Sequence, residues 1–424
     1  MTAVRTRRAG PLALLTSLIL LLLLAAPGVA SANLASRISA ALDKHGMAGS
    51  GTSVAVFDLT AKEYLYQLRP DVLRRPASNE KLVTSSTALA SWSATYRFST
   101  QVYLDAVPDA DGVVRGNVYL RGLGDPTLST TSFAKRHWGM ETGDVQDLVR
   151  GLRALGVKRV TGSVMADEGY FDSLRRVTNW RPSVFSNCGP LSALTLNESY
   201  SSSGGYVDDP ALTAASTLTK RLRAAGVRVV HAAGRAVAPI TATLACTERS
   251  ATLGRVLAAM NKPSDNFLAE ELLKGLGAGF GGAGTTASGA RVASSFLQGI
   301  GVDDGVRLRD GSGLSYQDRL TTHAVLKILG EMARRPDFPI FLRSLAIAGV
   351  DGTLADRMRG TAAAGNVRAK TGTLNVASSL SGYVTAANGH QLTFSMLMNG
   401  DPVNVAGAHA AQDAVAVLLA RSTP

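Results

Sequence analysis

Cysteine and histidine are scarce in this chain, and their scarcity excludes several classes of metalloprotein. The 424 residues include two cysteines, too few for a Cys-rich zinc or iron–sulfur framework. The six histidines are scattered, without a His-x-x-x-His or His-Glu pair, so we expect no histidine-based catalytic metal and no cofactor. Hydrophobic residues make up 46% of the chain and charged residues 18%, which excludes global disorder and permits a large core.

Acidic residues are the minority among the charged ones, and the formal net charge is +12. A basic surface can meet nucleic acid, anionic lipid or a polyanionic cell wall. The Lys and Arg residues are mostly spread singly, and no run of them is interleaved with aromatic residues. We therefore expect a solvated basic surface and no nucleic-acid partner.

The first 32 residues have the pattern of an export signal. Three arginines and no acid precede an apolar run over residues 12–26, and small residues follow up to Ala32. This order predicts a signal peptide over residues 1–32, cleaved after Ala32 on the general secretion route. The alternative is a retained anchor helix, but the run is shorter than the ~20 residues of a typical span. No other stretch is apolar enough to span a bilayer, so we expect an exported protein in the extracellular or cell-wall space, without a stable membrane anchor.

Export makes the two cysteines informative. In an oxidising compartment Cys188 and Cys246 are candidates for a disulfide. Closing so long a loop would stabilise the fold by roughly 4 kcal/mol in the chain-entropy model. The alternative is two buried thiols, because a disulfide also requires a short distance that sequence alone does not give.

Hydrophobic alternation near both ends of the mature chain predicts one antiparallel sheet. We expect two hairpins, the second with an Asn-Gly turn, from strands at residues 52–58, 63–68, 378–386 and 391–398. Helices are expected from Ser78 toward Trp92 and over residues 253–274, 290–300, 322–333 and 406–419. Hairpins at both ends with helices between them predict a sheet whose faces are covered by helices and whose chain ends are adjacent.

The middle of the chain has a different pattern. Short strands are expected near residues 101–104, 117–120 and 162–166, with a helix over 145–155 and loops rich in Gly, Asp and Ser. We interpret residues 98–247 as a smaller inserted α+β domain. Residues 33–97 and 248–424 then form the main α/β domain.

A nucleophile and a base are placed one helical turn apart at the start of the first long helix. Residues three apart share a helix face, so Lys81 Nζ can reach Ser78 Oγ. A hydroxyl is a weak nucleophile that needs a base, and burial or a second cation lowers the pKa of a lysine enough for that role. The motif alone is weak, since Ser132 and Lys135 repeat it in what we expect to be a solvated loop. Glu80, inside the first motif, is expected to be a charge on the helix surface.

Two further motifs strengthen this interpretation. Ser264-Asp265-Asn266 offers a hydroxyl and an amide at the start of a helix, and Lys370-Thr371-Gly372-Thr373 opens an edge-like strand before the last hairpin. Gly372 lets a substrate backbone approach closely. Ser-x-x-Lys, Ser-Asp-Asn and Lys-Thr-Gly in this order are the joint signature of serine β-lactamases and penicillin-binding proteins.

With these motifs the chain resembles the low-molecular-mass class C penicillin-binding proteins, D-alanyl-D-alanine carboxypeptidases of the serine peptidase S13 family. Further stretches resemble that family, and they are Leu120-Arg121-Gly122-Leu123-Gly124-Asp125-Pro126, Asp310-Gly311-Ser312-Gly313-Leu314-Ser315, Asp351-Gly352-Thr353-Leu354 and Leu380-Ser381-Gly382-Tyr383-Val384. The resemblance implies the penicillin-binding-protein/β-lactamase-like transpeptidase fold, peptidoglycan stem peptides as substrates and β-lactam antibiotics as covalent inhibitors. The stretch from Ser78 to Ser264 is shorter than in typical members, which carry two extra domains there.

The resemblance also implies the roles of the motif residues. Ser78 attacks the carbonyl of the penultimate D-Ala, and Lys81 accepts its proton. Ser264 passes a proton to the leaving amine, with Lys370 tuning its field. The residues implied in substrate binding are Asn266, Thr371, Gly372 and Thr373, and the backbone N–H groups of Ser78 and Thr373 form the oxyanion hole.

Three functions remain open on this evidence. The leading one is a DD-carboxypeptidase, with DD-endopeptidase activity on cross-links as an extension. The second is a β-lactamase, which has the same motifs but must deacylate quickly. The third is a penicillin-recognising esterase or binding protein, against which the complete set Ser78, Lys81, Ser264 and Lys370 argues.

Overall fold

The structure is a computed structural model that describes residues 1–3, 27–303 and 305–424. The apolar run expected at residues 12–26 lies outside the described residues. The first helix, α1 (Pro27–Lys44), runs across the predicted cleavage point, so cleavage after Ala32 stays a prediction. None of the helices in the described part of the chain is long and apolar enough to cross a membrane.

Six strands form the main sheet, in the order β11-β12-β13-β14-β1-β2. They are β1 (Thr52–Asp58), β2 (Glu63–Leu68), β11 (Ala346–Ile347), β12 (Arg368–Leu374), β13 (Ala377–Thr385) and β14 (Gln391–Asn399). Every neighbouring pair is antiparallel, and both expected hairpins are confirmed. β1 pairs with β14 along its whole length. The strands of this sheet that come first and last along the chain therefore lie side by side, as expected.

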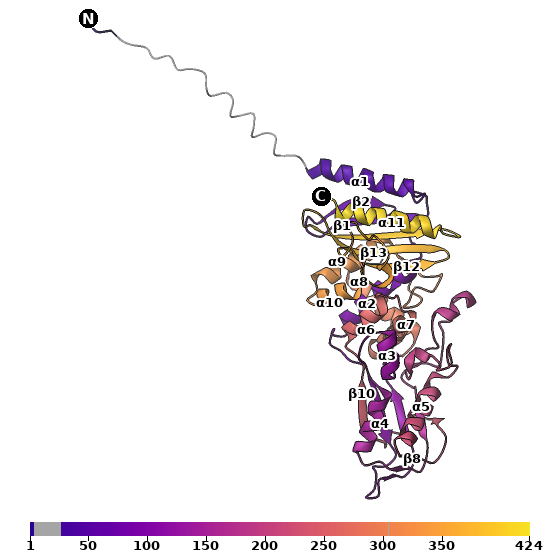
Figure 1. Cartoon of the computed structure of the whole chain (residues 1–424). Helices are drawn as coiled ribbons and strands as arrows, with labels where there is room; N and C mark the ends of the chain where they lie inside the picture. Colours follow the sequence, from indigo (N-terminus) through magenta and orange to yellow (C-terminus); the bar gives the residue numbers. More distant parts are fainter. Residues whose placement is uncertain (4–26, 304) are drawn as a thin grey trace.

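Helices cover both faces of this sheet (Figure 1). On one face lie α1 and α11 (Val405–Ala420), which pack on Val54 and Val56 of β1. Ala55, whose side chain points the other way, belongs to the core on the opposite face. Because both faces are covered, β13 and β14 are buried almost end to end.

The opposite face carries the helices that support the site. They are α2 (Glu80–Ser91), α6 (Leu253–Asn261), α7 (Asn266–Phe280), α8 (Thr286–Gly299), α9 (Thr322–Arg334) and the short α10 (Phe338–Ser344). The helix expected over residues 253–274 is two helices, α6 and α7. It breaks because Pro263 has no amide hydrogen and Ser264 adopts a left-handed backbone conformation with φ +68°.

Residues 99–249 supply two further sheets at the lower end of the molecule in Figure 1. A five-stranded sheet has the order β10 (Thr243–Arg249), β3 (Ser99–Leu104), β5 (Val118–Gly122), β7 (Val164–Asp167), β9 (Gly234–Arg235), and a three-stranded one has β4 (Val113–Val114), β6 (Arg159–Val160), β8 (Arg228–Val229). Helices α4 (Val145–Ala154) and α5 (Pro210–Ala224) pack with the strands around a hydrophobic core of their own. The expected strands and α4 are confirmed, α5 was not expected, and the division into a main and an inserted domain stays a prediction.

The second Ser-x-x-Lys motif is not the loop we expected. It lies in a short helix, α3 (Thr131–His137), which forms because the Thr130 side chain accepts a hydrogen bond from Phe133 N and caps the helix. Ser132 and Lys135 are both exposed, so this copy lacks the burial that a lysine base requires. The described part of the chain also contains four short 3-10 helices, which are η1 (Ala77–Asn79), η2 (Pro182–Asn187), η3 (Asn197–Ser199) and η4 (Gly352–Leu354).

Candidate active site

Ser78 and Lys81 lie together where η1 leads into α2. Lys81 Nζ donates a hydrogen bond to Ser78 Oγ at 3.0 Å, as the spacing of three residues predicted. Ser78 is half-buried, whereas Lys81 is fully buried. Ala77, directly before the serine, has φ +47°, a strained conformation for a residue with a side chain, and such strain is common at functional sites.

Lys81 has three hydrogen-bond acceptors, one for each proton of an ammonium group. Besides Ser78 Oγ, Nζ donates to Asn266 Oδ1 at 2.7 Å and to the Ser312 carbonyl at 2.8 Å. Burial lowers the pKa of Lys81 from 10.5 to about 8, against the opposing charges of nearby carboxylates, with Asp310 the largest of these. A minor fraction of the amine is therefore neutral near pH 7, which is the form that can accept a proton.

The repulsion between the two lysines acts on Lys370. Of the two causes expected for a lowered pKa of Lys81, burial is the one that acts there, and no second cation contributes. Burial first, and then the charge of Lys81, lower the pKa of Lys370 well below its usual value. The fully buried Nζ of Lys370 donates to the carbonyl of Thr371 at 2.9 Å.

The Ser264-Asp265-Asn266 motif lies at the break between α6 and α7. Asn266, the first residue of α7, bridges Lys81 through Oδ1 and the Asn187 carbonyl through Nδ2, the latter at 2.9 Å. Asp265 caps α7 by accepting from Leu268 N. Ser264 is half-buried, and its side chain makes no hydrogen bond with the described residues.

β12 presents the Lys370–Thr373 motif beside Ser78. The neighbouring strand β11 pairs with Arg368 and Ala369 only, so the described part of the sheet leaves the edge from Lys370 onward without a strand partner. This confirms the edge-like stretch expected from the sequence. A side-chain carbon on Gly372 would lie 2.8 Å from Ser78 N, which explains why this position needs glycine.

Four buried carboxyl groups lie behind Lys81, and Glu80 is one of them. Glu80 is 1% exposed, so our expectation of a surface charge was wrong. Burial, then the charges of Asp310 and Glu270, raise its pKa well above 4.5. Burial also raises the pKa of Glu270 to about 8 and that of Asp318 well above its usual value.

These acids hold the loop that supplies the third acceptor of Lys81. Glu270 Oε1 accepts from the backbone of Gly311 and of Ser312, at 3.1 and 2.8 Å. Asp310 accepts from Gly313 N and from Trp180 Nε1, both at 2.7 Å. The loop thus has its Ser312 carbonyl fixed toward Lys81, a contact that depends on backbone atoms and that no sequence motif identified.

The two cysteines do not form the candidate disulfide. Both are free thiols in the structure, and of the alternative of two buried thiols it bears out Cys188, whereas Cys246 is half-buried. Cys188 is buried at the end of η2 and contacts its neighbour's carbonyl, while Cys246 lies on β10 against the Leu148 carbonyl of α4. They belong to different hydrophobic cores, which is why the chain does not bring them together.

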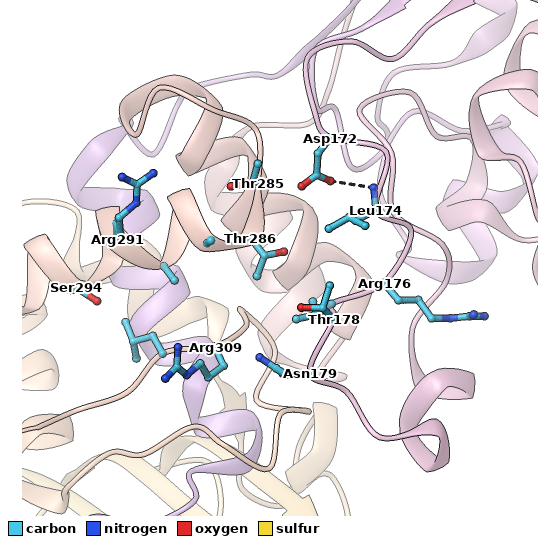
Figure 2. Close-up of a pocket in the computed structure, with 14 residues that line it drawn as sticks. Asp172, Leu174, Arg176, Thr178, Asn179, Thr285, Thr286, Arg291, Ser294 and Arg309 are labelled. Carbon is cyan, nitrogen blue, oxygen red and sulfur yellow. Dashed lines mark hydrogen bonds between the residues drawn. The ribbon is translucent and has the colours of Figure 1, made fainter.

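A separate pocket lies between residues 172–179, the start of α8 and Arg309 (Figure 2). Its volume is about 470 Å³, and a hydrogen bond from Leu174 N to Asp172 crosses its rim. The residues that line it include none of the motif residues. The chemistry suggested by the motifs therefore belongs to the Ser78 cluster and not to this cavity.

Comparisons with known proteins identify the family of the chain. A family model described as the D-Ala-D-Ala carboxypeptidase 3 (S13) family matches residues 34–204 and 199–422. A D-alanyl-D-alanine carboxypeptidase of Actinomadura sp. is 32% identical over 502 aligned residues, which cover 98% of this chain and 90% of that protein. A carboxypeptidase of Mycobacterium tuberculosis is 31% identical and covers 80% of this chain and 74% of its own length.

The solved structures show the same fold. Penicillin binding protein 4 of Haemophilus influenzae superposes with a TM-score of 0.73 at 19% identity, covering 88% of this chain and 98% of its own. A second structure of that protein, complexed with a β-lactam, has a TM-score of 0.70 at 20% identity over 89% of this chain and 98% of its own. The expected penicillin-binding-protein fold, with its main antiparallel sheet, is thereby confirmed. The chain therefore belongs to the D-Ala-D-Ala carboxypeptidase 3 (S13) family and is a serine-type D-Ala-D-Ala carboxypeptidase.

Proposed function

We propose that Ser78 is the nucleophile that attacks the carbonyl carbon of the penultimate D-Ala in a peptidoglycan stem pentapeptide. The attack breaks the peptide bond, releases the terminal D-Ala and leaves the remaining peptide as an ester on Ser78 Oγ, which water then hydrolyses. The observation that carries this proposal is the 3.0 Å hydrogen bond between Ser78 Oγ and a buried Lys81 whose pKa is lowered to about 8. In its neutral form Lys81 takes the proton of the attacking hydroxyl.

The other motif residues complete the reaction. Ser264 gives a proton to the leaving D-Ala amine, and Lys370 sets the field in which it does so. The position of Ser264 supports this role, because its neighbour Asn266 is hydrogen-bonded to Lys81. Asn266 also holds an amide of the substrate.

The stem peptide lies along the free edge of β12. The backbone N–H groups of Ser78 and Thr373 stabilise the oxyanion, a contribution that is typically ~10²–10³ in rate for each donor. A side-chain carbon on Gly372 would lie 2.8 Å from Ser78 N, and this closeness of the two backbones supports the pairing. The hydroxyls of Thr371 and Thr373 bind the terminal carboxylate near Lys370.

β-Lactams are covalent inhibitors under this proposal, and cross-links are a second substrate for DD-endopeptidase activity. The β-lactam complex of the Haemophilus influenzae relative supports the first statement. We further propose that the chain is exported and cleaved after Ala32, which N-terminal sequencing of the secreted protein would test.

Mass spectrometry after exposure to a penicillin tests the nucleophile. We expect one adduct on Ser78, with its mass increase abolished in Ser78→Ala and retained in Ser132→Ala. The second variant is a matched control, because Ser132 belongs to the exposed copy of the motif. An adduct that survives Ser78→Ala would contradict the proposal.

Two further readouts separate the alternatives. Release of D-Ala from a diacylated Lys-D-Ala-D-Ala peptide is expected of the carboxypeptidase and not of a binding protein. A penicillin adduct that persists for hours is expected of the carboxypeptidase, whereas rapid turnover would indicate a β-lactamase.

A further inference from the structure

A histidine and two carboxylates from three distant segments meet beside the catalytic loop. His137 ends α3, Glu198 belongs to η3, and Asp265 caps α7. His137 Nε2 lies 3.1 Å from Glu198 Oε2 and 3.9 Å from Asp265 Oδ2, and the three atoms all lie within 4.8 Å of one another. Ligands of a tetrahedral zinc ion are about 3.4 Å apart, as metal–ligand distances of about 2.1 Å require. A small movement of Asp265 would bring the set to that geometry.

Each carboxylate has one oxygen that is held by another donor and one oxygen that faces the cluster of His137, Glu198 and Asp265. Glu198 Oε1 accepts from Trp138 Nε1 at 2.9 Å, which leaves Oε2 directed at His137. Asp265 Oδ1 accepts from Leu268 N at 2.8 Å, which leaves Oδ2. Hydrogen bonds that fix the second atom of a ligand are typical of metal sites, because they set the direction of the first.

The backbone around Glu198 adopts an uncommon left-handed conformation. Asn197, Glu198 and Ser199 are three consecutive residues with side chains and positive φ, at 55°, 50° and 62°. Such backbone conformations persist where the surrounding contacts hold them in place. Here Asn197 Oδ1 accepts from Thr130 N, and Ser199 Oγ donates to the Pro190 carbonyl. The result is a Glu198 side chain that is 3% exposed yet aimed at a histidine that solvent can reach, at 34% exposed.

We propose that His137 Nε2, Glu198 Oε2 and Asp265 Oδ2 bind one divalent transition-metal cation, with Zn²⁺ the best fit to one imidazole and two carboxylates. Water would supply the fourth ligand on the exposed side of His137. The cation plays no part in the acyl transfer. It links residues 137–198 to the loop that carries Ser264 and Asn266 and so stabilises the position of that loop.

When His137 is protonated, its Nε2–H points at Glu198 and competes with a cation for the same place. The nearby carboxylates of Asp265, at 3.9 Å, and Glu198, hydrogen-bonded at 3.1 Å, raise the pKa of His137 to about 10, which favours an imidazolium beside the two carboxylates. The metal must displace this proton, and its affinity should therefore rise with pH. No sequence pattern predicts this set, because its members are 61 and 67 residues apart, far from any metal-ligand spacing.

The test is a titration of the full chain, without a histidine tag, by Zn²⁺ in a calorimeter, after dialysis against a chelator. We expect one ion per chain, and a visible absorption band of a tetrahedral or five-coordinate ion when Co²⁺ replaces Zn²⁺. His137→Ala and Glu198→Gln should each weaken binding at least 30-fold and abolish the band. His323→Ala is the matched control, because His323 Nδ1 pairs with one carboxylate, Asp71, at 2.7 Å and should leave binding unchanged.

Absence of stoichiometric Zn²⁺ binding by the wild-type chain would overturn the proposal, and so would equal binding by His137→Ala. Glu198 is buried, so its variant is first checked for native circular dichroism. His137 is on the exposed side of the cluster, and its variant keeps the proposal testable if Glu198→Gln does not fold.

Discussion

The pH dependence of acylation tests the role of Lys81 most directly. Lys81 must be neutral to take the Ser78 proton, and burial lowers its pKa to about 8. The neutral fraction is then about 1% at pH 6, about 9% at pH 7 and about 91% at pH 9. The second-order rate constant for acylation by a penicillin should therefore rise about tenfold from pH 6 to 7 and again about tenfold from pH 7 to 9, with a midpoint near 8.

Stopped-flow labelling with a fluorescent penicillin measures this rate constant, and circular dichroism at each pH controls for unfolding. A matched measurement on Lys135→Met, in the exposed copy of the motif, should reproduce the wild-type profile. A rate constant that is flat between pH 6 and 9, or one that falls as the pH rises, would show that Lys81 is not the base.

Three further predictions concern the surroundings of the site. Gly372→Ala places a carbon 2.8 Å from the amide of the nucleophile and should slow acylation by about 100-fold, whereas Gly330→Ala, in a helix with open space around it, should acylate normally. Glu270→Gln should stabilise the fold by up to about 3 kcal/mol at pH 7 in urea unfolding, because burial raises the pKa of this carboxyl from 4.5 to about 8. In the unfolded chain Glu270 ionises above pH 4.5, whereas in the folded chain it stays protonated. The stabilisation by Glu270→Gln should therefore grow between pH 4.5 and 8 and vanish below that range, and an equal stabilisation at pH 4 would contradict this prediction. Iodoacetamide in urea without reductant should alkylate both Cys188 and Cys246, and a mass without either addition would show that they are paired.

The catalytic motifs could be found from the sequence because each is short and local. One helical turn brings Lys81 to Ser78 whatever the rest of the chain does. The acid cluster was not predictable in the same way. Glu80, Glu270 and Asp318 come from distant segments, and nothing in local hydrophobic periodicity shows that the charged residue next to Lys81 is buried.

The fold divides along similar lines. The two hairpins of the main sheet have strong alternation and turn signals, and both are confirmed. Strands of two residues, such as β4 and β6, are too short for any periodicity, and α5 has too many Ala and Thr residues for a clear apolar face. The contacts of Lys81 and Asn266 with the carbonyls of Ser312 and Asn187 involve backbone atoms that every residue type possesses, so only the folded chain could reveal them.

The pairing of β1 with β14 has a consequence for biosynthesis. β1, which begins at Thr52, pairs with β14, which begins at Gln391. The main sheet therefore cannot form completely until nearly the whole polypeptide has been translated. A nonsense mutation upstream of residue 391 would remove β14, leave one edge of β1 unpaired and prevent formation of the active enzyme. Shortened products should therefore be insoluble or quickly degraded rather than partly active.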